Sequence, residues 1–219
     1  MSEKPILFSG AMVRAILEGR KCQTRRVVKF PPAPMKLGTW EPTTIGGPGT
    51  YLDKACTKPA GPAVTVMWHT RNGATVGCPY GHAGDRLWVR ENGWQRIGAS
   101  GSFDPYYFDA SMTEAEIAYL REHAFRFRRR PSIHMPRRFC RLVLEVTAVR
   151  VERLQEISSD DAIEEGIDPS DVGDAREEAA FNVAEYAELW DGLNKARGFG
   201  WDVNPYVWVI TFRRAEAPR

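Results

Sequence analysis

The stretch Glu18-Gly19-Arg20-Lys21-Cys22-Gln23-Thr24-Arg25-Arg26 decides how the fold of this chain is interpreted. It follows an apolar segment with helical spacing that starts after Ser9, a residue type whose side chain caps helix N-termini. Gly19 is predicted to end this helix, because glycine readily adopts the left-handed conformation found after a helix. The basic segment from Lys21 to Lys29 is predicted to be extended. The stretch therefore joins a short helix to a strand.

Four cations crowd this junction, namely Arg20, Lys21, Arg25 and Arg26. Cations near a helix C-terminus interact favourably with the helix dipole, which explains Arg20 and Lys21. Repulsion between like charges disfavours the continued run unless an anion or a carboxylate lies nearby. We therefore predict that the cluster faces a ligand, the alternative being a simply capped helix end.

The rest of the sequence predicts several strands and only a few short helices. Strands are expected at Ala63 to His69, Arg86 to Glu91, Leu142 to Val151 with a bulge near Ala148, and Tyr206 to Phe212. Helices are expected from Ser158 to Glu165, closed by Gly166, and from about Arg176 to Leu193. Residues 31–77, expected to form a loop or hairpin, and residues 93–132 are interpreted as insertions. This pattern predicts one α+β domain over residues 1–219, a small β-barrel decorated with short helices.

Composition excludes several classes of protein. The hydrophobic fraction of 43% and the charged fraction of 26% are ordinary for a globular chain, not for a disordered or collagenous one. No apolar run approaches the roughly 18 residues of a membrane span, and the first residues lack the apolar run of a signal peptide. The four cysteines show no repeated spacing. We expect a cytoplasmic protein with reduced thiols and no membrane contact.

The formal net charge of +2 conceals two neighbouring blocks of opposite sign. Residues 121–141 are rich in arginine with interleaved phenylalanine, whereas residues 152–188 are strongly acidic. Four arginines of the basic block are candidates for contact with a nucleic-acid backbone: Arg126, Arg128, Arg129 and Arg130. A solvated face, or neutralisation by the acidic block, are the alternatives.

The pattern Gly19-Arg20-Lys21-x-x-Thr24-x-Arg26 resembles the signature of the ASCH family, a branch of the PUA-like β-barrels implicated in RNA binding. Further segments also resemble this family: Gly84-Asp85-Arg86-Leu87-Trp88-Val89-Arg90-Glu91, Leu154-Gln155-Glu156-Ile157, Glu164-Glu165-Gly166-Ile167 and the strands already described. The whole chain is similar to ASCH-like proteins of phages and prophages, which share Pro131-Ser132-Ile133-His134-Met135-Pro136 and Trp201-Asp202-Val203-Asn204-Pro205. The resemblance implies a PUA-like barrel with two insertions.

Some compact bacterial members of the family are amidohydrolases that remove the acetyl group from N4-acetylcytidine with a lysine, a threonine and a glutamate. The resemblance places these roles on Lys21, Thr24 and Glu165. A threonine hydroxyl is a weak nucleophile until a base accepts its proton, and Lys21 would be that base if burial and nearby cations lowered its pKa. The residues expected to bind the modified nucleoside or RNA are Arg20, Arg25, Arg26, Trp88 and Glu91. No cofactor is implied.

Other interpretations of these residues stay open. The chain could be a non-catalytic RNA- or DNA-binding module, or a ribonuclease, an activity also found in the family. Thr24 and Glu165 could be an ordinary strand residue and a solvated acid, and Cys22 among cations could be a thiolate nucleophile. Three aromatic residues could stack on a base or lie in the core: Tyr80, Trp88 and Trp94. Four residues have zinc-compatible side chains at irregular intervals, which disfavours a metal site: Cys56, His69, Cys78 and His82.

Overall fold

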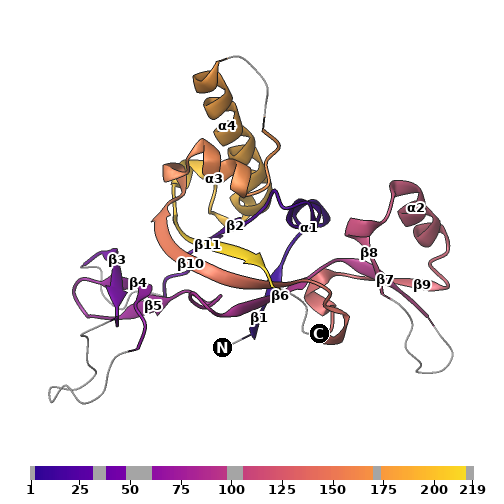
Figure 1. Cartoon of the computed structure of the whole chain (residues 1–219), viewed down its shortest axis with the longest axis horizontal. Helices are drawn as coiled ribbons and strands as arrows, with labels where there is room; N and C mark the ends of the chain where they lie inside the picture. The colour runs from indigo at the N-terminus through magenta and orange to yellow at the C-terminus, as the bar shows by residue number, and fades with distance from the viewer. Residues whose placement is uncertain (1–2, 32–37, 48–60, 98–105, 170–173, 216–219) are drawn as a thin grey trace.

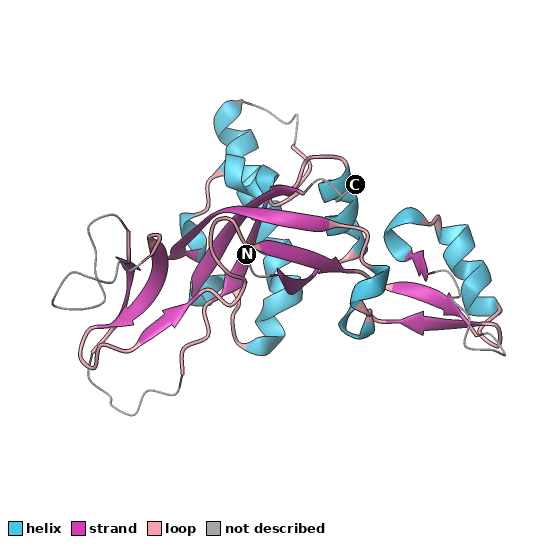
Figure 2. Ribbon diagram, turned by 60° about the horizontal axis from the view of Figure 1, so that its bottom comes forward, coloured by secondary structure: helices cyan, strands magenta, loops and turns pink. Residues whose placement is uncertain are grey.

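The structure is a computed structural model that describes residues 3–31, 38–47, 61–97, 106–169 and 174–215. It is a mixed α+β protein, as predicted, with three separate sheets and with most of its helices near the largest sheet (Figures 1 and 2). Within these residues, no helix combines the length and the apolar character needed to cross a membrane.

The central sheet has five strands in the order β1-β6-β10-β11-β2. Their bounds are β1 (Glu3–Leu7), β6 (Arg86–Arg90), β10 (Val143–Arg153), β11 (Tyr206–Arg214) and β2 (Gln23–Val27). β1 and β6 run parallel, and the other neighbours run antiparallel. In the described part of the chain, no strand pairing joins the edge strands β1 and β2, so the sheet is open there. The side chain of Arg26 bridges this gap by donating a hydrogen bond to the Leu7 carbonyl (2.7 Å).

Strand β10 is the long, curved central strand of the sheet (Figure 1). Its register with β11 shifts between Val146 and Ala148, which confirms the bulge predicted near Ala148. Before the shift, Leu144 and Val146 lie in the core, where they pack with apolar side chains of β1, β6, β11 and helix α1. After the shift, Val149 and Val151 pack against the same core cluster, because a single extra residue reverses which side chains face inward.

Helix α1 (Gly10–Leu17) begins and ends where the sequence predicts. The Ser9 side chain accepts a hydrogen bond from the Met12 amide (3.3 Å), and Gly19 has a φ of 82°. The chain then turns tightly into β2, since the Lys21 amide donates to the Ala15 carbonyl (3.1 Å). This local geometry fixes the start of the strand that carries Thr24, Arg25 and Arg26.

Helices α3 (Ser159–Glu164) and α4 (Ala175–Asn194) cover the end of the sheet next to β2 and β11 (Figure 1). Ser158 caps α3 and Gly166, with a φ of 97°, follows it, as predicted. The predicted apolar stripe of α4 divides in two. Tyr186 and Trp190 are buried, whereas Leu189 and Leu193 keep 38% and 49% of their surface exposed. The exposed half of the stripe is therefore available to line a pocket.

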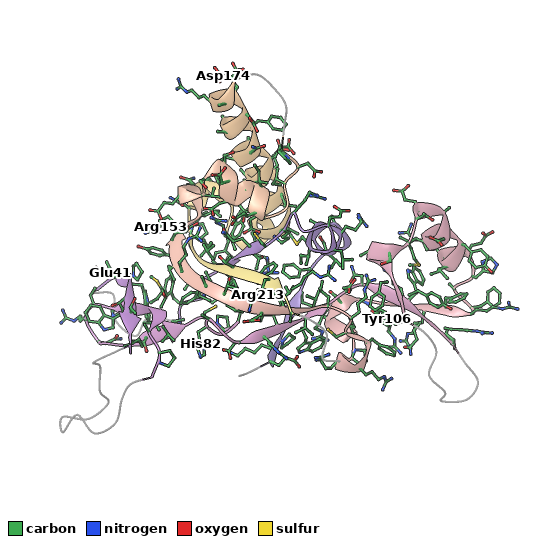
Figure 3. The ribbon with its side chains drawn as sticks, in the orientation of Figure 1. Glu41, His82, Tyr106, Arg153, Asp174 and Arg213 are labelled. Carbon is green, nitrogen blue, oxygen red and sulfur yellow. The ribbon has the colours of Figure 1, made fainter. Side chains whose placement is uncertain are left out.

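The two predicted insertions are more regular than loops. The first forms the sheet β3 (Trp40–Ile45), β4 (Val64–His69) and β5 (Thr75–Gly77), and the second forms the sheet β8 (Tyr106–Phe108), β7 (Gly93–Arg96) and β9 (Phe127–Arg130) with helix α2 (Glu114–Glu122). They extend from opposite sides of the central sheet, as Glu41 and Tyr106 mark in Figure 3. Short 3-10 helices complete the chain at Asp109–Ser111, Ser132–His134, Arg137–Phe139, Leu154–Glu156, Lys195–Arg197 and Trp201–Val203.

Candidate functional site

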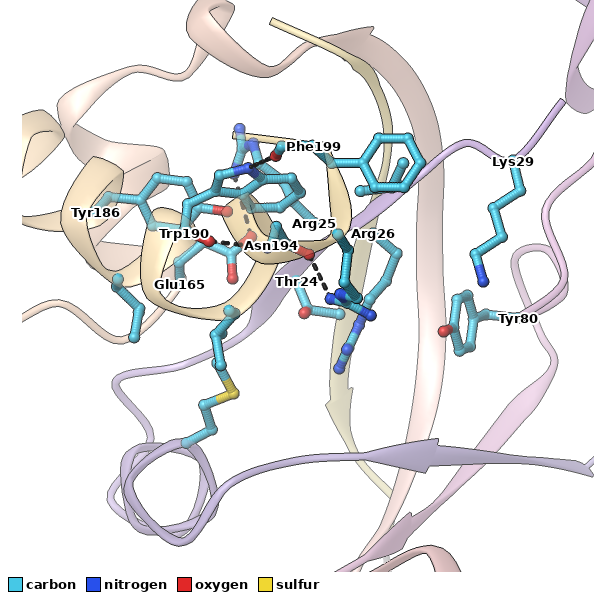
Figure 4. A pocket seen from close by; sticks show the side chains of 15 residues that line it. Thr24, Arg25, Arg26, Lys29, Tyr80, Glu165, Tyr186, Trp190, Asn194 and Phe199 are labelled. Carbon is cyan, nitrogen blue, oxygen red and sulfur yellow. Dashed lines mark hydrogen bonds and ion pairs between the residues drawn. The ribbon is translucent and has the colours of Figure 1, made fainter. Parts of the chain in front are cut away.

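A pocket of about 260 Å³ lies between the edge strand β2, the C-terminal end of α3 and helix α4 (Figure 4). This volume is just below the range of roughly 300–1,000 Å³ that is common for small-molecule sites. Thr24, Arg25 and Arg26 contribute to its wall from β2, and Glu165 contributes from the end of α3. The exposed apolar half of the α4 stripe, Leu189 and Leu193, lines the opposite side.

The pocket receives residues from both faces of β2. Successive side chains of a strand point to opposite faces, so Thr24 and Arg26 share one face while Gln23 and Arg25 share the other. β2 is an edge strand, so its open side gives both faces access to the same space. The run of cations in the sequence is therefore divided between two environments.

Lys21 and Glu165 form a buried pair beside this pocket. The Lys21 Nζ donates to Glu165 Oε2 (2.7 Å) and to the Glu165 main-chain carbonyl (2.6 Å). Lys21 is only 2% exposed and Glu165 only 4%. Burial lowers the pKa of Lys21 and outweighs the opposing effect of Glu165, and the charges of Arg26 and Arg25 act in the same direction as burial. This is the direction that a lysine general base requires.

Arg25 holds the carboxylates around this pair in place. Its guanidinium donates to Glu152 Oε1 (2.5 and 3.0 Å), Asp161 Oδ2 (2.8 Å), Glu165 Oε1 (3.5 Å) and Gln23 Oε1 (2.6 Å). An arginine has five N–H donors, and these five bonds use all of them. Burial alone would lower the pKa of Arg25, but the surrounding acidic groups raise it. Arg25 therefore has no donor left for a ligand.

Tyr186 completes the environment of Glu165 from helix α4. Burial raises the pKa of the Tyr186 phenol, as does its hydrogen bond to the Glu165 side chain, so the phenol stays protonated and donates to the carboxylate. The Arg25 guanidinium lies 5.9 Å from the centre of the Tyr186 ring. We call the set Lys21, Gln23, Arg25, Glu152, Asp161, Glu165 and Tyr186 the inner network. Its two cations and three carboxylates, with Arg150 pairing Glu152 (2.9 Å) and Asp161 (3.0 Å) from outside the set, compensate one another and fix the position of Glu165.

Thr24 supplies an aliphatic hydroxyl group to the pocket wall. It is only 3% exposed, it pairs with Ile210 of β11, and it lines the same pocket as Glu165 (Figure 4).

Cys22 does not line this pocket, and burial and the charge of Glu164 raise the pKa of its thiol. These effects favour the neutral thiol, so they argue against Cys22 as a thiolate nucleophile.

Arg26 differs from Arg25 in every contact. Its guanidinium lies 5.3 Å from the centre of the Phe8 ring and 5.9 Å from that of Tyr80. Its Nε atom is buried and has no hydrogen-bond partner among the described residues, and no described carboxylate forms an ion pair with it. Arg26 therefore brings an uncompensated positive charge to the pocket wall.

The other residues predicted to bind substrate do not line this pocket. Arg20 forms ion pairs with Glu18 (2.6 Å) and Asp168 (2.9 Å). Glu91 is buried against Arg141 (2.7 Å), and Trp88 lies under the guanidinium groups of neighbouring arginines. The sheet order explains the separation, because β10 and β11 lie between β6 and β2.

The residues considered for base stacking and for a metal site lie in separate parts of the structure. Tyr80 lines the pocket, whereas Trp94 is buried in the sheet β8-β7-β9. His69 packs edge-on against Trp40, and Cys78 and His82 line a different pocket. In the described part of the chain, no three histidine, cysteine, aspartate or glutamate side chains are grouped to hold a metal ion. Cys56 lies outside the described residues.

Several residues of the site were not identified from the sequence. Glu152, Asp161 and Tyr186 belong to the inner network, and Lys29 and Arg197 line the pocket. Tyr186 carried one usable signal, since it is a polar aromatic residue within an apolar helical stripe that must be buried. Glu152 and Asp161 carried no such signal, because they lie in a segment with many similar acids.

The chain matches no family model, no curated protein and no solved structure. The chemistry available to the pocket therefore follows from its own side chains. The pocket wall supplies a hydroxyl group, a fixed carboxylate and an uncompensated guanidinium, and buried Lys21, whose pKa is lowered, lies behind the carboxylate without lining the pocket. This set suits nucleophilic attack on a carbonyl group followed by transfer of its acyl group.

Proposed function

We propose that the protein is an amidohydrolase that removes the acyl group from N4-acetylcytidine or a related acylated nucleoside. The observation that carries this proposal is the meeting of Thr24, from β2, with Glu165, from the distant end of α3, in one pocket beside buried Lys21. The proposal includes an ASCH-type, PUA-like identity for the central sheet. In its support, α1, β6, β10, α3 and β11 all occur at the segments that carry the resemblance.

The first half of the reaction forms an acyl-enzyme. Neutral Lys21 accepts the proton of the Thr24 hydroxyl while Thr24 Oγ1 attacks the carbonyl carbon of the acetyl group. Arg26 stabilises the negative charge that develops on the carbonyl oxygen. The bond between the carbonyl carbon and N4 then breaks, and the Lys21 ammonium returns its proton to N4. The products of this half are cytidine and an acetyl ester on Thr24.

The second half regenerates the enzyme. Lys21 accepts a proton from a water molecule, whose oxygen attacks the ester carbon. The bond to Thr24 Oγ1 breaks, and the proton on Lys21 passes back to that oxygen as acetate leaves. Glu165 is a positioning residue in both halves, since its carboxylate and its main-chain carbonyl both bind the Lys21 Nζ. The apolar side chains of Leu189 and Leu193 offer a surface for the planar base.

The direct test is incubation with N4-acetylcytidine, followed by chromatography of the cytidine released. We expect turnover by the wild-type protein and none by Lys21→Ala or Thr24→Val. Arg121→Ala is the matched control, because it removes an exposed charge from helix α2, away from the pocket. No turnover by the wild type, or full turnover by Lys21→Ala, would contradict the mechanism.

A second candidate function, single-stranded RNA binding, is favoured by the sheet of β9. Arg128 and Arg129 are exposed on this strand, and Phe125, just before it, is 72% exposed. Among the described residues, no acid of the acidic block pairs with these arginines; some of its acids pair with Arg20, Arg25 and Arg150, and Arg129 pairs with Asp109 (3.6 Å), which lies outside the block. Arginines beside exposed aromatic rings suit a phosphate backbone with unstacked bases.

RNA binding is tested by the anisotropy of a fluorescent oligonucleotide over a range of salt concentrations. Affinity should fall steeply with salt, and the variant Arg128→Ala/Arg129→Ala/Arg130→Ala should reduce both the affinity and the salt slope. The control Arg14→Ala/Arg176→Ala/Arg213→Ala removes three exposed arginines elsewhere. Equal binding by both variants would exclude this surface, and cleavage of the oligonucleotide would favour the ribonuclease alternative.

A further inference from the structure

We infer that the pocket binds its ligand through a phosphate group, so that its substrate class is a nucleotide and not a free nucleoside. The phosphate lies at the pocket mouth, which we define by Arg26, Lys29 and Arg197. This inference rests on the proposed function for the identity of the base. The phosphate site itself rests on the charges described below.

The three cations of the pocket mouth lack carboxylate partners. In the described part of the chain, no carboxylate forms an ion pair with any of them, although buried Arg25, next to Arg26 in sequence, contacts three acids. Arg197 is held by an amide, because its Nη2 donates to Asn194 Oδ1 (2.6 Å). Among the described residues that line the pocket, Glu165 is the only acidic one, and it is already bound by Lys21 and Arg25.

Such an arrangement attracts an anion. Three like charges around one small pocket repel one another, and no acid of the lining is free to offset them. Arg26 is the most constrained of the three. It is packed against Phe8 and Tyr80, and its Nε is buried without a partner among the described residues. A bound anion would compensate this charge.

Phosphate fits the geometry of these donors. The planar fork of Arg197 binds two oxygens of one phosphate and Lys29 adds a mobile point charge, while Arg26 contributes its charge to the attraction and keeps its donors for the acyl oxygen. Figure 4 shows Arg26 between Thr24 and Lys29, with Lys29 beside Tyr80. An acylated base whose carbonyl carbon lies at Thr24 would therefore direct the rest of the molecule toward the pocket mouth. A phosphate carried by its sugar would meet the cations there.

The test compares cytidine 5′-monophosphate with cytidine by titration calorimetry at low salt. We expect the monophosphate to bind about tenfold more tightly, and this advantage to be lost in Lys29→Ala/Arg197→Ala. The control Arg96→Ala/Arg121→Ala removes two exposed arginines, one from the sheet β8-β7-β9 and one from helix α2. This control should still bind the monophosphate more tightly than cytidine. Arg26 is left intact, because it also has a role in the proposed reaction. Equal binding of both compounds, or an advantage that survives in the pocket variant, would overturn the inference.

A second arm separates this inference from the proposed function. If neither N4-acetylcytidine nor its 5′-monophosphate is hydrolysed but the binding difference holds, the amidohydrolase proposal fails and the phosphate site stands. If both are hydrolysed with equal kcat/KM and bind equally, the amidohydrolase stands and the phosphate site fails. Competition by a short RNA identifies the source of the phosphate. Weaker competition than by the monophosphate supports a mononucleotide, and stronger competition supports the same site on a polynucleotide backbone.

Discussion

The inner network and the pocket mouth both contain arginine side chains. Carboxylates surround the arginine of the inner network, whereas no described carboxylate pairs with the arginines of the pocket mouth. Arg25 belongs to the first and Arg26 to the second, although they are neighbours on β2. Arg25 uses all its donors on acids and one amide, whereas Arg26 is packed on aromatic rings and has no described carboxylate partner. The alternation of a strand sends the two side chains to opposite faces. One face of β2 therefore organises the site, and the other meets the ligand.

This difference predicts different consequences of mutation in the two regions. Removing a member of a buried, compensated network leaves a buried charge without its partner, which costs stability or catalysis. Removing an uncompensated charge from a pocket wall costs little stability, because no opposite charge loses its partner. The contrast can be tested one residue at a time.

The largest effect is expected for Lys21→Ala. Loss of a general base usually costs about 10²–10⁴-fold in rate, so kcat/KM for N4-acetylcytidine should fall by about that factor. Steady-state kinetics measures it, with circular dichroism to show that the variant is folded. A fall of less than about fivefold would remove Lys21 from the chemistry.

The next effect is on stability and distinguishes the two arginines. Arg25→Ala removes the buried guanidinium that Glu152, Asp161 and Glu165 share, and breaking a buried ion pair costs about 3–5 kcal/mol, even though Arg150 still pairs with the first two acids and Lys21 with the third. Arg26→Ala loses one hydrogen bond, to Leu7, worth about 1 kcal/mol, and its contact with the Phe8 and Tyr80 rings, worth about 0.5–1 kcal/mol, so its loss should be the smaller one. Urea unfolding of both variants measures the difference. Equal losses would contradict the division between inner network and pocket mouth.

A smaller effect concerns the pH dependence of activity. In the proposed mechanism the neutral form of Lys21 is the base, so kcat/KM should rise with pH as Lys21 loses its proton, below the pH expected of an ordinary lysine. The charge of Glu165 raises the pKa of Lys21, so Glu165→Gln should shift this rise to lower pH. Glu164→Gln, one residue earlier, is the control and should leave the profile in place. An unchanged profile in Glu165→Gln would show that Glu165 does not act through Lys21.

The smallest effect is expected for Lys29→Ala. Lys29 is exposed and forms no ion pair with a described residue, so the free energy of unfolding should change by less than about 0.5 kcal/mol. The same urea titration measures it. A loss of 2 kcal/mol or more would mean that Lys29 has a structural role and would weaken the distinction between the regions.

The sequence allowed local features of the fold to be predicted, but not which charged side chains pair with one another. Ser9, Gly19, Ser158 and Gly166 mark helix ends through interactions within a few residues, and the change of apolar phase near Ala148 marks the bulge. The strands of the two insertions were mostly missed, because their pairing joins segments far apart. β7 pairs with β9 about thirty residues later, across α2.

The site was predictable only in part for the same reason. Lys21, Thr24 and Glu165 were proposed as one set, and the structure brings them to one place. The different environments of Arg25 and Arg26 could not be predicted, since the acids that bind Arg25 come from β10 and α3. Trp88 was assigned to the substrate from its motif, but the sheet order places it on a strand remote from the pocket.

The most direct measurement is the turnover of N4-acetylcytidine by the wild type, Thr24→Ser and Thr24→Val. The variants differ at one position inside a strand, where serine keeps a hydroxyl and valine keeps the shape. We expect cytidine release by the wild type, reduced release by Thr24→Ser and none by a folded Thr24→Val. No release by the wild type, or release by Thr24→Val at the wild-type rate, would contradict a threonine-dependent amidohydrolase.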